Sequence, residues 1–404
     1  MKIHKNQLID YSLVLLLIVI SGIHIPYPTM FYIFTFVYSF YIFIIRKKKT
    51  DKLFLIIMSL FIFIFSIQTF IFSFVSMITI FGFFIRVLIA YFVIKAVDYR
   101  FMKIYIKLMF YLAFVSLLFY VVTGLSTSIA DFLTSNFAIY KWGYGYMELK
   151  SKTSILGLYT YAPDDKWYRN IGPYGEAGMF AGHLLLAYML NFFSDNNDKK
   201  RNGIILLIAI FTTLSTTVLL AVSVFLFFVY YQNIKNSLLR VLIVLCFVIG
   251  GPYAYFNLDF IGPKIESQIS RAMEVDPFLE DTNTQRFLNI LRDVEDFKGH
   301  EVFGRGLNPY TRYSYDPENQ IRTVGLTDIL VKFGTPLFIL IMYFIYHSIR
   351  LYLLSQKKYN FFNCFGIFFS ILVLLMSEPY FNYPLFWSLL FLQFIYKVRK
   401  RPIS

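Results

Sequence analysis

A short turn that carries two charged residues precedes one of the apolar runs of this chain. Arg169 is followed, after Gly172 and Pro173, by the sequence Tyr-Gly-Glu-Ala-Gly, in which Glu176 is the carboxylate. Glycine lets the backbone bend closely, and an acid at the end of a membrane helix costs free energy unless it is paired or functional. Glu176 is therefore a functional candidate, or else the structural partner of an arginine.

Aromatic side chains are dense in the segment that leads to this turn. Exposed rings among hydrogen-bonding groups suit sugars, because the C–H faces of a sugar stack on rings while its hydroxyl groups seek polar partners. The simpler interpretation is an aromatic belt at a membrane interface. The rings are Trp142, Tyr144, Tyr146, Tyr159, Tyr161, Trp167 and Tyr168, followed by Tyr174 within the turn.

The segment 284–298 has the periodicity of an amphipathic helix. Apolar residues form one stripe, at Phe287, Ile290, Leu291, Val294 and Phe297. At about 100° per residue, an adjacent stripe collects Arg286, Asn289, Asp293 and Asp296. Ordinary salt bridging along a helix is the simpler explanation of the two aspartates. Arg286 is a functional candidate, and the polar stripe lies close to the membrane if the apolar stripe docks on it.

A glycine-rich turn with an embedded arginine follows this helix. It reads Gly304-Arg305-Gly306, then Leu-Asn-Pro with Asn308. The planar fork of an arginine takes two oxygens of a phosphate or diphosphate, so Arg305 is a candidate anion ligand and Asn308 a neighbouring polar ligand. His300, just before the turn, is a candidate proton carrier, or else an idle surface histidine.

The elements that must position these residues are membrane helices. Hydrophobic residues make up 58% of the 404 residues and charged residues 15%. The block 257–322 nevertheless holds 12 of the 24 acidic and 8 of the 38 basic residues. Apolar runs of about 18 residues or more indicate membrane spans. We predict about twelve, near 8–25, 28–45, 53–72, 75–94, 104–123, 173–193, 203–217, 218–232, 238–256, 324–346, 360–376 and 380–396.

The positive charge indicates the orientation of these spans. Seven short segments hold 23 lysines and arginines against 4 acidic residues, at 1–7, 46–52, 95–107, 194–202, 233–240, 348–359 and 397–404. The positive-inside rule places all seven, and both termini, in the cytoplasm. We therefore expect an all-α polytopic membrane protein. Residues 1–256 would supply nine spans with an outer loop at about 124–172, residues 257–323 a large, partly helical outer loop, and residues 324–404 three more spans.

The net charge of +14 and the two cysteines add little chemistry. The charge lies in short clusters between apolar runs, which is typical of membrane topology and does not indicate a nucleic-acid partner. Cys246 and Cys364 both fall inside apolar runs, where neither a thiolate nor a metal site is favoured. We predict no disulfide, no metal and no cofactor.

The order of these features resembles the superfamily of O-antigen and capsular polysaccharide polymerases and ligases. The resemblance covers the layout of nearly the whole chain, although its motifs are short. They are the entry of the span after Arg169, Leu214-Ser215-Thr216-Thr217, Arg286-Phe287, Phe303-Gly304-Arg305-Gly306, Gly325-Leu326-Thr327-Asp328, Phe333-Gly334-Thr335-Pro336, Glu378-Pro379-Tyr380 and Trp387.

The resemblance implies a metal-independent glycosyltransferase at the outer face of the bacterial cytoplasmic membrane. Its donor is a glycan on a polyprenyl diphosphate, and Arg169, Arg286 and Arg305 match the arginines thought to hold the diphosphate. Guanidinium groups stabilise such a leaving group as its charge grows. A general base must also accept the proton of the acceptor hydroxyl. Its place stays open among Glu176, Asp293 and His300.

The resemblance also favours a polymerase over a ligase. Ligases of the superfamily often have a histidine just before the span that opens here at Val324, and this chain has Ile321-Arg322-Thr323 there. A flippase or other exporter is the alternative from another class, although transporters usually have symmetric halves and these halves differ. The expected partners are the lipid-linked oligosaccharide, membrane lipid, and possible accessory proteins such as a chain-length regulator and a flippase.

Arg86 is the only charge between Leu53 and Tyr91. A charged residue within a span is expensive to bury, so Arg86 should face the protein interior or an aqueous cleft. We expect it to bind diphosphate or to pair with Glu176. Either expectation fails if Arg86 points to lipid.

Overall fold

The computed structural model describes residues 5–73, 76–143, 151–163, 168–231, 286–314 and 322–396, with the single residues 234, 236, 238 and 266. Apart from these single residues, the predicted span at 238–256 and the first part of the predicted outer loop 257–323 lie outside the described residues. The same is true of Tyr144, Tyr146 and Trp167.

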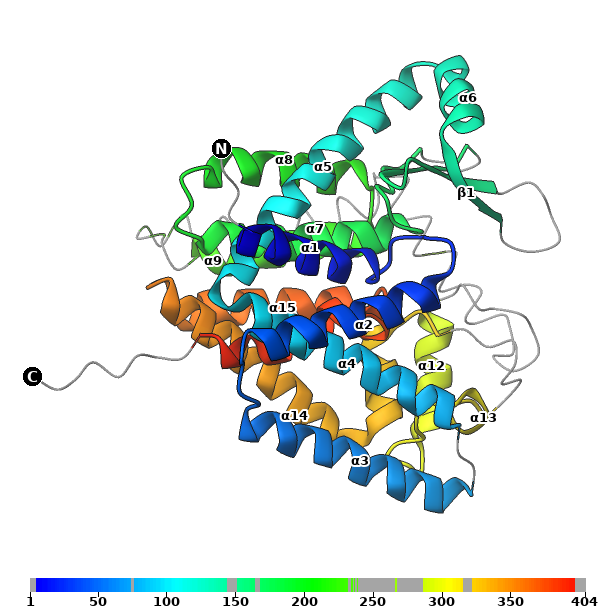
Figure 1. The fold of residues 1–404 in the computed structure, drawn as a ribbon, viewed down its shortest axis with the longest axis vertical. Coiled ribbons are helices and arrows are strands. Elements are labelled where there is room, and N and C mark those ends of the chain that lie inside the picture. Colours follow the sequence, from blue (N-terminus) through cyan, green and yellow to red (C-terminus); the bar gives the residue numbers. More distant parts are fainter. Residues whose placement is uncertain are drawn as a thin grey trace, which may run out of the picture.

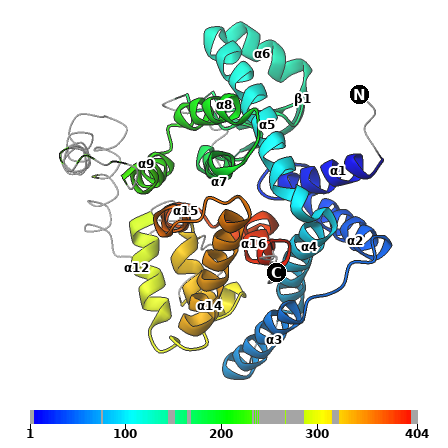
Figure 2. The ribbon, with the colours of Figure 1, turned by 90° about the vertical axis from the view of Figure 1, so that its left-hand side faces the viewer.

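Most of the described chain is helical (Figure 1). The helices are α1 (Lys5–Val19), α2 (Pro28–Ile45), α3 (Lys52–Phe72), α4 (Met77–Val97), α5 (Phe101–Leu125), α6 (Thr127–Asn136), α7 (Ala177–Phe193), α8 (Lys199–Thr212), α9 (Thr216–Tyr231), α12 (Arg286–Phe297), α13 (Pro309–Arg312), α14 (Gly325–Ser355), α15 (Phe361–Leu375) and α16 (Pro384–Phe391). Figure 2 shows α12 alongside α14, and α15 beside α9.

Several of these helices have the length and apolar composition of membrane spans. Within the described residues, four helical stretches are long enough to cross a membrane, namely α2, α3, the stretch Met77–Leu125 and α14. Shorter apolar helices lie at α1, α7, α9, α15 and α16. The chain is thus a mostly helical protein with membrane-type helices, while the count of twelve spans stays a prediction.

Several predicted boundaries differ from the structure, while the expected break within 203–232 is present. The helix within 8–25 ends at Val19, and the helix within 380–396 covers only Pro384–Phe391 before a short 3₁₀ turn. The run 203–232 is two helices, as expected. The break falls at Leu214, whose φ of 49° is left-handed and therefore interrupts a right-handed helix.

The expectation of an all-α fold is wrong for part of the loop 124–172. Strands β1 (Ala138–Gly143), β2 (Ser151–Ile155) and β3 (Tyr159–Tyr161) form an antiparallel sheet in the order β1-β2-β3. Isoleucine, tyrosine and threonine recur in these strands, and these residue types favour a pleated backbone. The helix-sized apolar runs that guided the prediction carry no signal for such short strands.

A kink in α14 explains how the turn containing Arg305 is held. Gly334 has φ 76° and ψ 167°, and Pro336 has no N–H to donate, so carbonyl groups in the preceding turn lose their helical partners. The turn at 304–306 supplies new donors. The amide of Arg305 donates to the carbonyl of Val331 at 2.8 Å, and that of Gly306 donates to the carbonyl of Lys332 at 3.1 Å.

Two of the seven segments predicted to share the cytoplasmic side, 46–52 and 95–107, lie together. Ion pairs join 46–52 to 95–107, and both segments to α1. The pairs are Lys48–Asp98 at 2.6 Å, Lys95–Asp51 at 2.7 Å, Arg46–Asp10 at 2.5 Å and Arg100–Asp10 at 2.7 Å. This end of the molecule is therefore tied by charge, although the side of the membrane that it faces stays a prediction.

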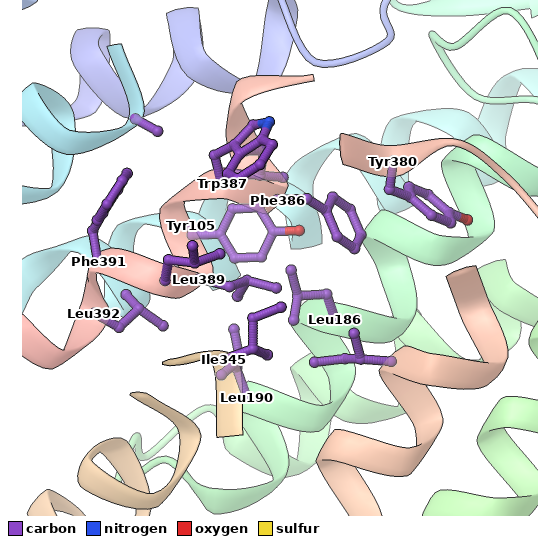
Figure 3. Close-up of a cluster of buried hydrophobic side chains, with 14 of the residues drawn as sticks. Tyr105, Leu186, Leu190, Ile345, Tyr380, Phe386, Trp387, Leu389, Phe391 and Leu392 are labelled. Atoms are coloured by element: carbon purple, nitrogen blue, oxygen red, sulfur yellow. The ribbon is translucent and has the colours of Figure 1, made fainter. Parts of the chain in front are cut away.

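The core lies around α16, between α5, α7 and α14. Figure 3 shows Tyr105, Leu186 and Ile345 gathered about the buried rings of Phe386 and Trp387. The indole N–H of Trp387 donates to the carbonyl of Phe381 at 2.7 Å. This packing fixes the connection 376–383 between α15 and α16, which carries the charged residue described next.

Candidate functional site

Arg286, at the start of α12, forms an ion pair with Glu378 in the connection 376–383. Its Nη2 donates to Oε1 of Glu378 at 3.1 Å, and its Nη1 donates to Oγ1 of Thr217 at 3.3 Å. The Glu378 side chain is 7% exposed and that of Arg286 is 25% exposed. The guanidinium is therefore oriented by protein and still reaches solvent.

Glycines let Glu378 approach two helices, with its carboxylate toward α7 and its backbone carbonyl toward α14. A Cβ added at Gly178 in α7 would lie 2.5 Å from Oε1 of Glu378, and one added at Gly325 would lie 2.4 Å from the Glu378 carbonyl. The hydroxyl of Tyr380 donates to the carbonyl of Gly178 at 2.9 Å. The starts of α7 and α14 are thus packed directly against the connection that holds Glu378.

Glu176 lies near the residues around Glu378. It is the residue before α7, its side chain is exposed, and it makes no capping hydrogen bond to the helix. The buried Tyr380 interacts electrostatically with Glu378, Arg286 and Glu176. We call these residues, with Thr217, the Arg286 site. It brings together two of the predicted residues, Arg286 and Glu176.

The residue after Arg169 contacts the end of α8. This residue, Asn170, is buried. The backbone N–H of Asn170 donates to the carbonyl of Thr212 at 2.9 Å, and its Nδ2 donates to Oγ1 of Thr212 at 3.0 Å. Thr212 ends α8, and Thr217, the partner of Arg286, lies in the first turn of α9. Asn170 and Arg286 therefore contact the two ends of one short connection, and Arg169, next to Asn170 in the chain, is half-buried.

Tyr174 has a packing role in this structure. Its ring is fully buried, lies 5.5 Å from the ring of Phe180 and 4.7 Å from that of His183 between centroids, and its backbone pairs with Ile23. A buried ring offers no face to a sugar. The predicted contact of Tyr174 with substrate therefore finds no geometric support, because its aromatic character serves the core.

A buried ionic network joins α12, α13 and α14. Arg312 lies 2.5 Å from Asp293, 3.2 Å from Asp296 and 3.2 Å from Asp328. Arg322 contributes 3.0 Å contacts to Asp293 and Asp296. We call this set, with Lys332 beside Asp328, the Asp293 network. Among the described residues, no group of three or more His, Cys, Asp or Glu is placed to hold a metal ion.

The Asp293 network explains why α12 buries its polar stripe, although its apolar stripe was expected to dock. Asp293 and Asp296 are buried, whereas Leu291 and Val294 of the predicted apolar stripe are about half exposed. Ion pairs with arginines of α13 and its surroundings turn the polar stripe inward. The expectation that the apolar stripe docks and leaves the polar stripe accessible is therefore wrong for these four residues.

The environment of Asp293 favours a structural role over proton transfer. Its carboxylate is 1% exposed and accepts hydrogen bonds from Arg312, Arg322 and Thr327. Burial raises the pKa of the neighbouring Asp296, but the charges of Arg312 and Arg322 and the bond from Ser314 outweigh it, so the pKa falls below 3.8. Of the three predicted bases, Glu176 is the exposed carboxylate.

Arg305, Asn308 and His300 organise the turn after α12. The Nε of Arg305 donates to the carbonyl of Thr311 at 2.6 Å, and its Nη1 donates to Oγ of Ser314 at 2.6 Å. The side chain of Asn308 caps α13 by accepting from the amide of Tyr310 at 2.9 Å. Burial and the charge of Arg305 lower the pKa of His300 below 6.5, so its imidazole is neutral at neutral pH.

Arg86 faces the protein interior, as expected for a charged residue within a predicted span, because exposing its charge to lipid would cost free energy. It lines a cavity of about 280 Å³ together with Lys332 and Asn382. Its Nε donates to the carbonyl of Gly82 and its Nη1 to that of Asn382, both at 3.1 Å. The alternative pairing with Glu176 is not formed, and Arg86 makes no ion pair with any described residue.

Sequence reasoning missed three charged residues as members of a site. Glu378 occurs in the sequence only within a short motif, and no sequence pattern indicates Arg312 or Lys332. Glu378 has a readable signal, because it is a lone carboxylate followed by proline between two apolar runs. Arg312 has none, since its three carboxylate partners are fixed by tertiary packing.

Comparisons with known proteins identify no family for this chain: no family model, no curated protein and no solved structure matches it. The resemblance to polysaccharide polymerases and ligases therefore depends on the motifs in the sequence, and the geometry of the Arg286 site carries the functional argument.

Proposed function

We propose that the protein is a polysaccharide repeat-unit polymerase of the bacterial cytoplasmic membrane. The observation that carries this proposal is the Arg286 site. A guanidinium from an amphipathic helix reaches a connection between apolar helices, where a carboxylate orients it and one part stays open to solvent. An oriented, partly desolvated guanidinium is suited to bind a diphosphate.

The reaction transfers a glycan between lipid carriers. The bond between the anomeric carbon of the donor glycan and its polyprenyl diphosphate breaks, and a glycosidic bond forms to a hydroxyl group of the acceptor unit. The leaving diphosphate gains negative charge, which Arg286 stabilises, and in this proposal Arg169 supplies a second guanidinium. The residue set supports this charge stabilisation without a metal or a nucleotide.

Glu176 is our choice for the general base. The proton of the acceptor hydroxyl must leave as the new bond forms, and an exposed carboxylate beside Tyr380 has room to receive it. Asp293 is engaged by two arginines, and His300 lies 5.2 Å from the ring of Phe72 in a separate turn. Both remain alternatives that substitution can exclude.

The proposed topology places the Arg286 site at the outer face, opposite the end tied by lysine and arginine ion pairs. A lipid-linked oligosaccharide that has crossed the membrane is then the substrate. A flippase and a chain-length regulator are the expected partners. The number of spans and the position of both termini in the cytoplasm belong to this proposal.

The test is an incubation of the purified full-length protein with lipid-linked repeat units, without metal and without nucleotide. A ladder of longer glycans on the same lipid is the expected result. Transfer to a different acceptor would indicate a ligase instead. Movement of the lipid-linked glycan across vesicles without chain extension would indicate a flippase and overturn the proposal.

A further inference from the structure

A cavity with two cationic side chains is lined by part of the connection 376–383, which also carries Glu378 of the Arg286 site. It has a volume of about 280 Å³, and the charged residues that line it are Arg86 of α4 with Asp328 and Lys332 of α14. Asn382 forms part of its wall, and its side-chain oxygen accepts from the ammonium of Lys332 at 3.2 Å. Glu378 and Asn382 are four residues apart, so their Cα atoms are at most about 14 Å apart.

The charges around this cavity do not balance. In the described residues, the Asp293 network contains three carboxylates and three cations, since Lys332 pairs with Asp328 and the two arginines share the rest. The network is thus neutral as a unit. Arg86 adds one positive charge and makes no ion pair with any described residue. An anion that enters the cavity would meet an unneutralised guanidinium beside an ammonium group.

The position of the cavity favours an anion attached to a lipid. Arg86 is nine residues into α4, which corresponds to about 14 Å along the helix axis. Thr79 and Phe83 face the cavity from the same helix, while Ile78 and Phe81 are exposed on its outer surface. Helix α4 alone therefore separates the cavity from an apolar surface. A lipid could place its headgroup in the cavity and its apolar tail against that surface.

The other end of the cavity leads toward polar groups. A smaller neighbouring cavity shares Thr79 and Leu307 with it, and is lined by Gln68, Arg305 and Asn308. A headgroup at Arg86 could thus extend an attached polar chain toward the turn at 304–308. The aromatic wall of the larger cavity, which includes Phe333 and Trp387, offers apolar surface at the same level.

We propose that the Arg86 cavity binds the diphosphate headgroup of a second lipid-linked substrate. This inference depends on the proposed function, because a polymerase joins two units that are each carried on a polyprenyl diphosphate. The Arg286 site would hold the donor headgroup, and the Arg86 cavity that of the acceptor. The connection 376–383 contributes a residue to each site, Glu378 to the first and Asn382 to the second.

The test counts bound lipids on the full-length protein in detergent by native mass spectrometry. The probe is farnesyl diphosphate, with farnesyl phosphate, farnesol and inorganic diphosphate in parallel arms. Two molecules of farnesyl diphosphate should bind to the wild type, and one each to Arg86→Gln and Arg286→Gln. Loss of a charge-assisted hydrogen bond should weaken binding at the altered site about ten- to hundred-fold.

Matched variants separate binding from folding. Arg86→Lys keeps the charge and should retain the second lipid, and each variant's melting temperature reports its fold. Lys103→Gln is the control, since Lys103 lines a cavity of about 240 Å³ among segments predicted to be cytoplasmic. That variant should still bind two lipids.

Several outcomes would overturn the inference. Two lipids bound to a folded Arg86→Gln variant would show that the cavity is not the second site. If farnesol bound as tightly as farnesyl diphosphate, the cavity would not recognise the anion. If inorganic diphosphate bound as tightly as farnesyl diphosphate, the cavity would not recognise the lipid. Because the count requires no turnover, two-lipid binding without chain extension would contradict only the proposed polymerase function.

Discussion

Nη2 of Arg286 lies 3.1 Å from Oε1 of Glu378, although 92 residues separate them in the chain. This pair ties a helix of the charge-rich block to the connection between two apolar helices. The carboxylate orients the guanidinium and lowers its freedom, while the exposed part of Arg286 stays available to an anion. An arginine that is already oriented loses less entropy when it binds a diphosphate.

The exposed carboxylate of Glu176 leads to the first prediction. Glu176→Gln keeps the shape of the side chain but cannot accept a proton, so the rate of chain extension should fall about 10²- to 10⁴-fold. Binding of the lipid-linked substrate should change little. The rate is measured across pH together with that of His300→Ala. If His300→Ala lost the activity and Glu176→Gln kept it, the base would be His300.

The close contact at Gly178 leads to the second prediction. Gly178→Ala should destabilise the protein by about 1–3 kcal/mol and reduce chain extension, because the new methyl group would overlap Oε1 of Glu378. Gly203→Ala is the matched control, since its Cβ would meet its nearest atom at 3.4 Å. Melting temperature in detergent and the extension rate check both. Equal behaviour of the two variants would argue against the packing described here.

The Asp293 network leads to the third prediction. Arg312→Met removes the cation that three buried carboxylates share and leaves them with an excess of negative charge, so the free energy of unfolding should fall by about 3–5 kcal/mol. Lys298→Gln removes the exposed pair with Glu295 and should change it by less than about 0.5 kcal/mol. Chemical denaturation in detergent measures both. A stable Arg312→Met variant would mean that the network does not hold α12 to α14.

The lowered pKa of Asp296 leads to the fourth prediction. The folded state binds fewer protons than the unfolded state near pH 3.8, so this group contributes stability above that pH and loses it as the pH falls through its folded pKa. The melting temperature should therefore drop between about pH 5 and about pH 3. Asp296→Asn should be less stable at neutral pH and show a shallower drop. A melting temperature that rises on acidification would contradict this assignment.

Local patterns in the sequence were sufficient for part of this structure. The apolar runs predicted membrane-type helices, and the helical periodicity predicted α12 with Arg286 at its start. The break near Leu214 was also expected, because two segments of the same predicted side required a second crossing. These features depend on residues that are close together in the chain, and periodicity and charge patterns carry information about such residues.

The remaining features depend on contacts between distant segments. Nothing near Glu378 indicates that Arg286 is its partner, and nothing near Asp293 indicates that Arg312 will bury it. Tyr174 has the residue type of a sugar ligand, but its burial is decided by Phe180 and His183. The inward turn of the polar stripe of α12 has the same cause, since ion pairs outweighed the docking of Leu291 and Val294.

The most direct test of the central claim is the rate of chain extension by Arg286→Gln, measured with lipid-linked repeat units and no metal. The account predicts a loss of about 10²- to 10³-fold, because a donor aimed at the developing charge is removed. Arg201→Gln, an exposed residue paired with Asp198, should keep the wild-type rate. A folded Arg286→Gln protein that extends chains at the rate of the Arg201→Gln control would contradict the account.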